Sequence, residues 1–116
     1  MYNFEKLNVW KESVSLAEVV YVLCKQLPKE EKYALADQLK RAVTSICLNI
    51  AEGSGGRNKK IFASYLENAI RSLYETVAAL KLAERLFGIS VKRPLEQCDK
   101  VGKLLHGLLK NIRSEN

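Results

Sequence analysis

The 116-residue sequence contains only two prolines and six glycines, so few residues interrupt regular secondary structure. It also lacks an apolar run of the roughly 18 to 20 residues that a membrane-spanning helix needs. Residues 1–11 mix Glu5 and Lys6 with apolar side chains, whereas a secretory signal has a basic start and an apolar middle. We therefore expect a cytoplasmic protein in which residues 1–116 form a single domain.

Histidine and cysteine are too few and too scattered for most metal chemistry. Cys24, Cys47 and Cys98 form no C-x-x-C pair, which argues against a disulfide framework and against a thiolate zinc site. One histidine, His106, cannot supply the paired Glu-x-x-His motifs of a di-iron bundle. We expect no metal and no cofactor, and we expect each cysteine to pack as a small apolar residue.

Cations outnumber anions, with 19 Lys and Arg against 13 Asp and Glu, a net charge of +6. The sequence pI is about 9.3. Such an excess favours binding to polyanions, of which nucleic acid is the commonest. Composition alone does not separate this from a basic surface that is only solvated.

Apolar residues recur at three- and four-residue steps almost throughout, which predicts helices and no strand. Two adjacent stripes in the first segment predict a helix that packs against two neighbours and ends before Pro28. The first stripe is Leu7, Trp10, Val14, Ala17, Tyr21 and Cys24, and the second is Leu16, Val20, Leu23 and Leu27.

A second helix is expected from Pro28, with Glu30 and Glu31 at its positive end, to Ala51 or Glu52. The third helix has Asn58 as its N-cap and Gly88 at its C-terminus, and the fourth starts near Ser90 with Pro94 in its first turn. The buried stripes of these two helices are Phe62, Leu66, Ala69, Leu73, Thr76, Leu80, Ala83 and Phe87, then Val91, Leu95, Cys98, Gly102, Leu105, Leu109 and Ile112.

Four helices of about 20 residues joined by short turns predict an all-α fold. Short connections make consecutive helices antiparallel, and heptad-like spacing suits the shallow crossing angles of bundles. The expected architecture is an antiparallel up-down-up-down four-helix bundle.

The glycine-rich stretch at residues 53–60 does not fit a nucleotide-binding loop. A Walker loop beginning at Gly53 needs glycine where Asn58 stands, and it follows a strand rather than a helix. The stretch predicts a helix-to-helix turn whose glycines adopt conformations denied to other residues. Arg57, Lys59 and Lys60 could bind a backbone phosphate near the N-terminus of the third helix, or could only be solvated.

Polar residues precede this turn on one side of the second helix. Ser45, Asn49 and Glu52 are spaced i, i+4 and i+7, directly before Gly53. They could form a buried network that specifies how helices or subunits meet, or could hydrogen-bond the turn. No histidine lies nearby in sequence, and Glu52 has no second carboxylate beside it in the motif. We therefore expect these residues to have a structural role, and we expect no enzymatic activity.

The fourth helix carries a basic stripe, and it is the second candidate for phosphate contact. The alternative is that these cations only stabilise the helix, because positive side chains near a helix C-terminus interact favourably with the negative end of its dipole. Aromatic residues lie mostly on apolar stripes, so base stacking is poorly provided for, and the helices are too long for a helix-turn-helix. The basic stripe consists of Lys100, Lys103, His106, Lys110 and Arg113.

The fragment SICLNIAEGSGGRNKKIFASYL resembles the signature of the four-helix bundle family encoded in intervening sequences of bacterial 23S ribosomal RNA genes. The likeness extends over nearly the whole chain. The chain departs from the usual pattern at Cys47, Leu48, Arg71 and Val77. Typical family positions are occupied by Gln38, Arg41, Ser45, Asn49, Glu52, Gly53, Arg57 and Phe62.

This resemblance implies a ring-like homopentamer that binds nucleic acid and has no established enzymatic activity. It also implies an architecture similar to that of the accessory protein of diversity-generating retroelements. The alternative function is a protein-interaction adaptor or accessory subunit, for example of a reverse transcriptase, with no direct nucleic-acid binding. Tyr2, Phe4 and Trp10 could bury a subunit interface or complete the monomer's own core.

Overall fold

The computed structural model describes residues 1–115, and within them the regular structure is helical throughout. Two short 3-10 turns accompany the long helices and lie before α1 and before α2. The elements in order are η1 (Asn3–Lys6), α1 (Asn8–Cys24), η2 (Lys29–Glu31), α2 (Leu35–Ser54), α3 (Lys59–Phe87) and α4 (Lys92–Ser114).

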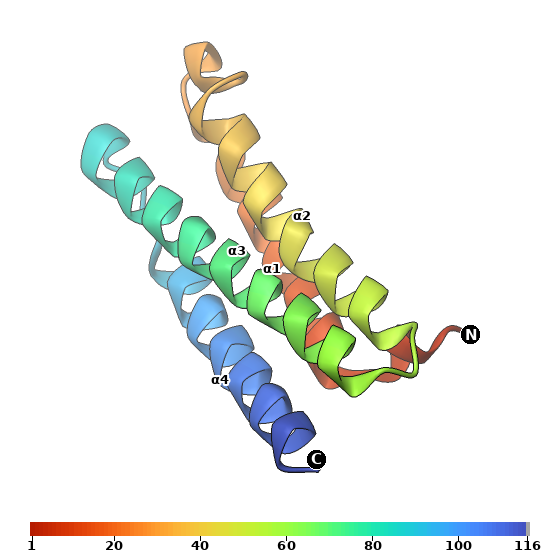
Figure 1. Cartoon of the computed structure of the whole chain (residues 1–116). Helices are drawn as coiled ribbons and strands as arrows, with labels where there is room; N and C mark the ends of the chain where they lie inside the picture. The colour runs from red at the N-terminus through yellow and green to blue at the C-terminus, as the bar shows by residue number, and fades with distance from the viewer. Residues whose placement is uncertain (116) are drawn as a thin grey trace.

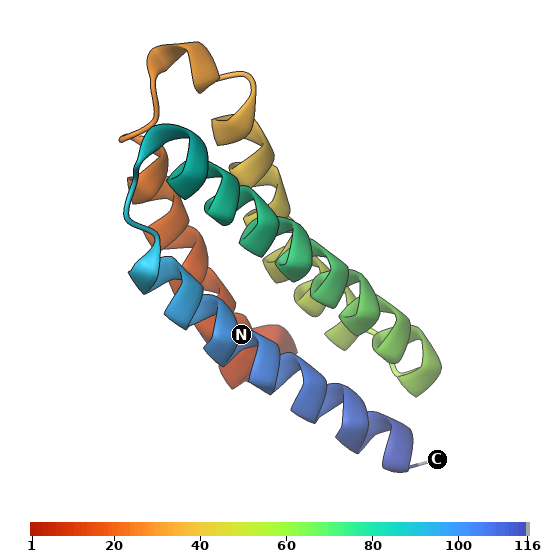
Figure 2. The same cartoon turned by 90° about the vertical axis from the view of Figure 1, so that its left-hand side faces the viewer.

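The long helices form the antiparallel four-helix bundle that the sequence predicts (Figures 1 and 2). Each helix packs against the next in the chain, and α4 packs back against α1. The molecule is 47 Å long, and the 29 residues of α3 account for about 43 Å at 1.5 Å per residue. The third helix therefore spans nearly the whole molecule. None of the described helices is long and apolar enough to cross a bilayer.

The core side of α1 differs from the expected one. Leu16 and Val20 of the second stripe are fully buried, whereas Trp10 and Val14 of the first are only half-buried. Tyr21 is 42% exposed. The helix packs against α2 on one side and α4 on the other, so the second stripe, which lies between these two contacts, faces the centre of the bundle. The first stripe lies at the border of the core.

The connection between α1 and α2 was predicted wrongly. The second helix begins at Leu35 rather than at Pro28, and Lys29–Glu31 form a separate 3-10 turn. Glu31 still serves the start of α2, because its Oε1 accepts a hydrogen bond from the N–H of Leu35 at 3.3 Å. The helix also continues to Ser54, past the expected end at residues 51–52.

The predicted ends of α3 are confirmed. The Asn58 side chain accepts a hydrogen bond from the N–H of Ile61 at 3.1 Å, which caps the N-terminus. Gly88 has φ +68°, and its N–H donates to the carbonyl of Glu84 at 2.9 Å. A left-handed glycine therefore ends the helix.

Two polar residues are completely buried in the core, and both hydroxyls are satisfied within their own helix. Ser13 donates to the carbonyl of Trp10 at 2.7 Å, and Thr76 donates to that of Ser72 at 2.8 Å. On α4 the heptad positions Leu105 and Leu109 are buried as predicted. The core thus satisfies its polar groups locally and joins the helices mainly through apolar side chains.

Gly53 allows α2 and α3 to approach each other closely. A Cβ atom at this position would lie 2.6 Å from Cβ of Tyr65 and 2.9 Å from a ring carbon of Phe62. The expectation that the glycines of this stretch adopt special backbone conformations is wrong, because Gly88 is the one described residue with positive φ. Gly53 is helical, and it is required for packing.

Replacing Gly53 with alanine should therefore destabilise the fold by about 1–3 kcal/mol, the usual cost of overpacking a tight contact. The measurement is the free energy of unfolding from urea denaturation. Gly56→Ala is the matched control, because a Cβ there meets nothing within 4 Å, and its effect should stay within about 0.5 kcal/mol. Equal effects of the two substitutions would contradict the proposed role of Gly53.

Candidate nucleic-acid interface

The cations of the α2–α3 turn are exposed, but not all of them are free. Nζ of Lys59 lies 2.6 Å from Oε2 of Glu115, near the C-terminus of α4. No such partner is found for Arg57 or Lys60 among residues 1–115. The Asn58 side chain already accepts a hydrogen bond from the N–H of Ile61, so fewer free N–H groups remain at the start of α3 to bind an anion.

The basic stripe of α4 is exposed along its whole length, and its two ends are paired with carboxylates. Nζ of Lys100 lies 3.1 Å from Oε1 of Glu12 on α1. Arg113 pairs with Glu67 on α3, and the other carboxylate oxygen of Glu67 lies 4.0 Å from Arg71. The middle of the stripe, Lys103, His106 and Lys110, has no ion pair in the described part of the chain.

The structure brings the turn cations close to one end of the basic stripe on α4, but not to the other end. The ion pair of Lys59 with Glu115 places the turn beside the C-terminus of α4, so Arg113 and the turn cations share one end of the bundle. Lys100 lies 13 residues earlier on α4, about 20 Å away along the helix. The candidate interface therefore runs from the turn along the outside of α4.

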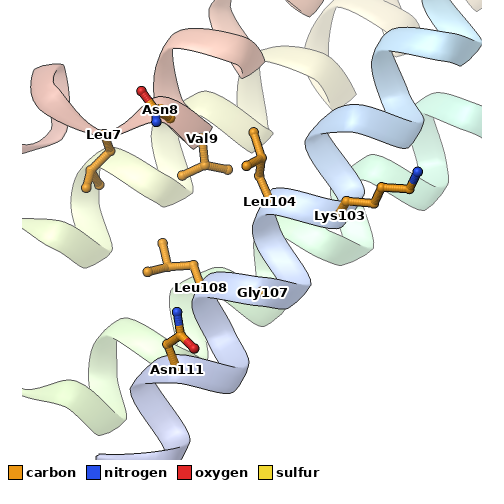
Figure 3. Close-up of a pocket in the computed structure, with 8 residues that line it drawn as sticks. All are labelled: Leu7, Asn8, Val9, Lys103, Leu104, Gly107, Leu108 and Asn111. Atoms are coloured by element: carbon orange, nitrogen blue, oxygen red, sulfur yellow. The ribbon is translucent and has the colours of Figure 1, made fainter.

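The cavity beside this stripe is apolar, with a volume of about 320 Å³ between α4 and the start of α1. Leu104 and Leu108 face Leu7 and Val9 across it, and the Lys103 side chain points away from these four (Figure 3). The cavity is thus a gap in the packing of α1 on α4 rather than a pocket for phosphate.

Ser45 and Asn49 lie between α2 and α3 and form a polar network there. The Ser45 hydroxyl lies 2.8 Å from that of Ser72 on α3, and Nδ2 of Asn49 donates to the carbonyl and the hydroxyl of Ser45 at 2.8 and 3.0 Å. Glu52 is exposed and takes no part. The network helps to align the two helices, and it has no titratable member.

The expectation that aromatic residues lie mostly on apolar stripes is wrong for most of the tyrosines. Tyr2, Tyr33 and Tyr74 are 76%, 85% and 66% exposed. At the N-terminus the Phe4 ring meets the Trp10 ring edge-on at 4.8 Å, so these two residues complete the monomer's own packing. Exposed rings are therefore available for stacking at several places on the surface.

The cysteines are free thiols, and burial favours their protonated form. Burial raises the pKa of Cys98 to about 12, helped by the nearby charge of Asp99. Burial also raises the pKa values of Cys24 and Cys47. For Cys47 a hydrogen bond with Ser13 lowers the pKa and partly offsets the effect of burial. None of the three thiols suits a nucleophile at neutral pH.

The family model described as 23S rRNA-intervening sequence protein matches residues 5–107. The chain belongs to this family. The resemblance read from the residue 45–66 signature is thereby confirmed. A search of curated proteins gives no match.

A solved relative supports the same assignment. The crystal structure of a protein with unknown function from the S23 ribosomal protein family of Bacteroides thetaiotaomicron VPI-5482 has a TM-score of 0.78 to this chain. The two are 27% identical, and the match covers 88% of this chain and 95% of that one. The bundle is thus shared over nearly the full length of both proteins.

The burial of the cysteines predicts an order of thiol modification. At pH 8 the Cys98 thiol is almost entirely protonated, since burial raises its pKa to about 12. Cys47, which is half-buried, should react with an aromatic disulfide reagent before the buried Cys24 and Cys98. The labelled sites are located by peptide mass spectrometry.

In urea all three thiols should react at similar rates, and Cys47→Ser should remove the fastest phase of the folded protein. Labelling of folded protein at Cys98 ahead of Cys47 would show that the α3–α4 contact opens more readily than this structure implies. The rate at each site should rise with pH, because the raised pKa keeps the thiol protonated below it.

Proposed function

We propose that this protein is a cytoplasmic, non-enzymatic, oligomeric helical bundle that binds RNA or DNA through backbone phosphates. The observation that carries the proposal is the meeting of the α2–α3 turn with the C-terminal part of α4. Arg57 and Lys60 from the turn and Lys110 from α4 are exposed and lack a carboxylate partner among the described residues. Such cations bind phosphates without reading base sequence.

The paired cations can join such an interface at small cost. The side chains of the Lys59–Glu115 pair are 51% and 54% exposed, and those of the Arg113–Glu67 pair are 54% and 40% exposed. Exposed ion pairs contribute only about 0–1 kcal/mol each. A nucleic-acid phosphate can therefore replace Glu115 or Glu67 as the partner of these cations.

Oligomerisation is supported by apolar side chains on the outside of α3. Tyr74, Leu82 and Leu86 are 66%, 50% and 63% exposed. With the exposed Ala78 they are spaced every four residues and form a row, which we call the α3 apolar row. Rows of this spacing form the ridges that pack into grooves of another helix. We propose that the row is a subunit contact in a ring, with five subunits as the family resemblance implies.

The second candidate function, a protein-interaction adaptor or accessory subunit, is supported by the same α3 apolar row. In that case the row binds a different protein, for example a reverse transcriptase, and the basic surface serves solubility. The two functions differ in whether purified protein alone binds nucleic acid.

The first test is binding of nuclease-treated protein to labelled duplex DNA and structured RNA across a salt series. Neutralising Lys103, Lys110 and Arg113 to glutamine should weaken binding and reduce the slope of log affinity against log salt by about two to three, near 0.9 per lost phosphate contact. If the turn holds the phosphates, the triple substitution of Arg57, Lys59 and Lys60 has this effect instead.

The charge-matched control is the substitution of Lys81, Arg85 and Lys92, three exposed cations away from the proposed interface. It removes the same net charge and should change the slope much less. An equal loss from all three sets would indicate attraction by net charge alone. Absence of binding at low salt by folded protein would favour the adaptor.

The second test is the mass in solution. The wild-type protein should be several times heavier than the 13.1 kDa chain, and Tyr74→Ser, Leu82→Ser and Leu86→Ser together should yield monomer. Because these side chains are at least half exposed, the helix content by circular dichroism should not change. Val22→Ser, at a residue 61% exposed on α1, is the matched control. A monomeric wild type would reject the ring.

A further inference from the structure

The connection between α1 and α2 forms a second basic site, which the sequence patterns did not reveal. A pocket of about 380 Å³ opens there, and all of its charged lining residues are lysines. Lys29 comes from η2, Lys32 from the loop that follows, and Lys40 from α2. The rest of the lining is apolar or uncharged, and consists of Cys24, Leu27, Pro28 and Ala36.

None of the three lysines forms an ion pair with a carboxylate among the described residues. Glu31 accepts a hydrogen bond from the Leu35 N–H, and Oδ2 of Asp37 lies 3.0 Å from Nε of Arg41. Glu30 is exposed and is not among the residues that line the pocket. Three lysines that line a pocket with an apolar floor attract an anion that also carries an apolar or planar part.

Two tyrosine rings lie beside the same lysines. Nζ of Lys40 is 5.2 Å from the centroid of the Tyr21 ring, and Nζ of Lys32 is 5.3 Å from that of the Tyr33 ring. Tyr33 is 85% exposed and Tyr21 is 42% exposed. Cations beside exposed aromatic rings are the combination that binds single-stranded nucleic acid, because bases stack on the rings while the cations hold the phosphates.

We propose that this corner binds an unpaired nucleotide of single-stranded RNA or DNA. The phosphate lies among Lys29, Lys32 and Lys40, and the base stacks on Tyr33 or enters the apolar floor. A paired base is stacked inside its duplex and cannot reach such a site, so the corner selects unpaired segments.

This site is separate from the phosphate contacts proposed for the turn and α4. The connection at residues 25–34 and the turn at residues 55–58 lie at opposite ends of α2 (Figure 1), whose 20 residues span about 30 Å. The inference therefore goes beyond the proposed function, and the two can fail independently.

The experiment measures binding of a fluorescein-labelled uridine homopolymer of about ten nucleotides, within the usual length of such sites. A second probe is an abasic oligonucleotide of the same length and charge. Tyr33→Ala should weaken binding of the uridine probe by about tenfold, since stacking contributes strongly per base, and should leave the abasic probe unaffected. Tyr33→Phe, which keeps the ring, should bind the uridine probe as the wild type does.

Lys29→Gln, Lys32→Gln and Lys40→Gln together should weaken binding of both probes and reduce the salt slope by about two, near 0.7 per contact for single strands. Tyr2→Ala, which removes an exposed tyrosine outside the α3 apolar row, is the matched control. Equal effects of Tyr33→Ala and Tyr2→Ala would overturn the proposal. So would equal affinity for the two probes, or competition by an acidic peptide as strong as that by unlabelled oligonucleotide.

The same variants tested on duplex DNA separate this site from the interface at the turn and α4. Tyr33→Ala should leave duplex binding unchanged, and the substitutions in the turn and in α4 should affect it most. If uridine binding follows the turn and α4 substitutions instead of Tyr33 and its three lysines, the corner is not the site for unpaired nucleotides.

Discussion

The close contact of α2 with α3 at Gly53 is the constraint on which the candidate interface depends. The missing side chain lets the α2 backbone approach Tyr65 and Phe62, and the Ser45–Ser72 contact lies further along the same pair of helices. Together they fix where α3 begins. Because α4 runs antiparallel to α3, they also fix which part of α4 lies next to the turn. The distance between the turn cations and Arg113 is thus set by helix packing.

Ion pairs at this end hold the cations in place without removing them from solvent. Glu115 and Glu67 orient Lys59 and Arg113 toward the α3–α4 boundary, and about half of each side chain stays exposed. An arrangement of this kind would suit the non-specific contact proposed above, because the carboxylates would hold the cations in place until a phosphate replaced them. The corner formed by α1 and α2 differs, since its lysines surround an apolar floor and lie beside aromatic rings.

Local sequence signals predicted the parts of the fold that depend on neighbours in the chain. Asn58 and Gly88 mark the ends of α3 through hydrogen bonds within a few residues, and the apolar period identified all the long helices.

What depends on contacts distant in sequence was missed. The partners Glu12 and Glu67, the preferred side of α1 and the role of Gly53 follow from how helices pair. The corner at residues 25–34 was missed because the sequence pattern predicts that α2 starts at Pro28, which would place Lys29, Lys32 and Lys40 on a regular helix. The antiparallel packing of α3 and α4 is what brings Lys59 near Glu115.

The start of α1 and the end of α4 contact the same cavity, through Leu7 and Leu108 (Figure 3). The start of α1 and the end of α4 therefore lie at the end of the bundle that carries the α2–α3 turn (Figure 1). A linker that joined them would allow new ends to be opened in the connection at residues 25–34 without cutting a long helix. Such a circular permutant would keep every pair of helices in register, and it would move any fused segment from one pole of the molecule to the other.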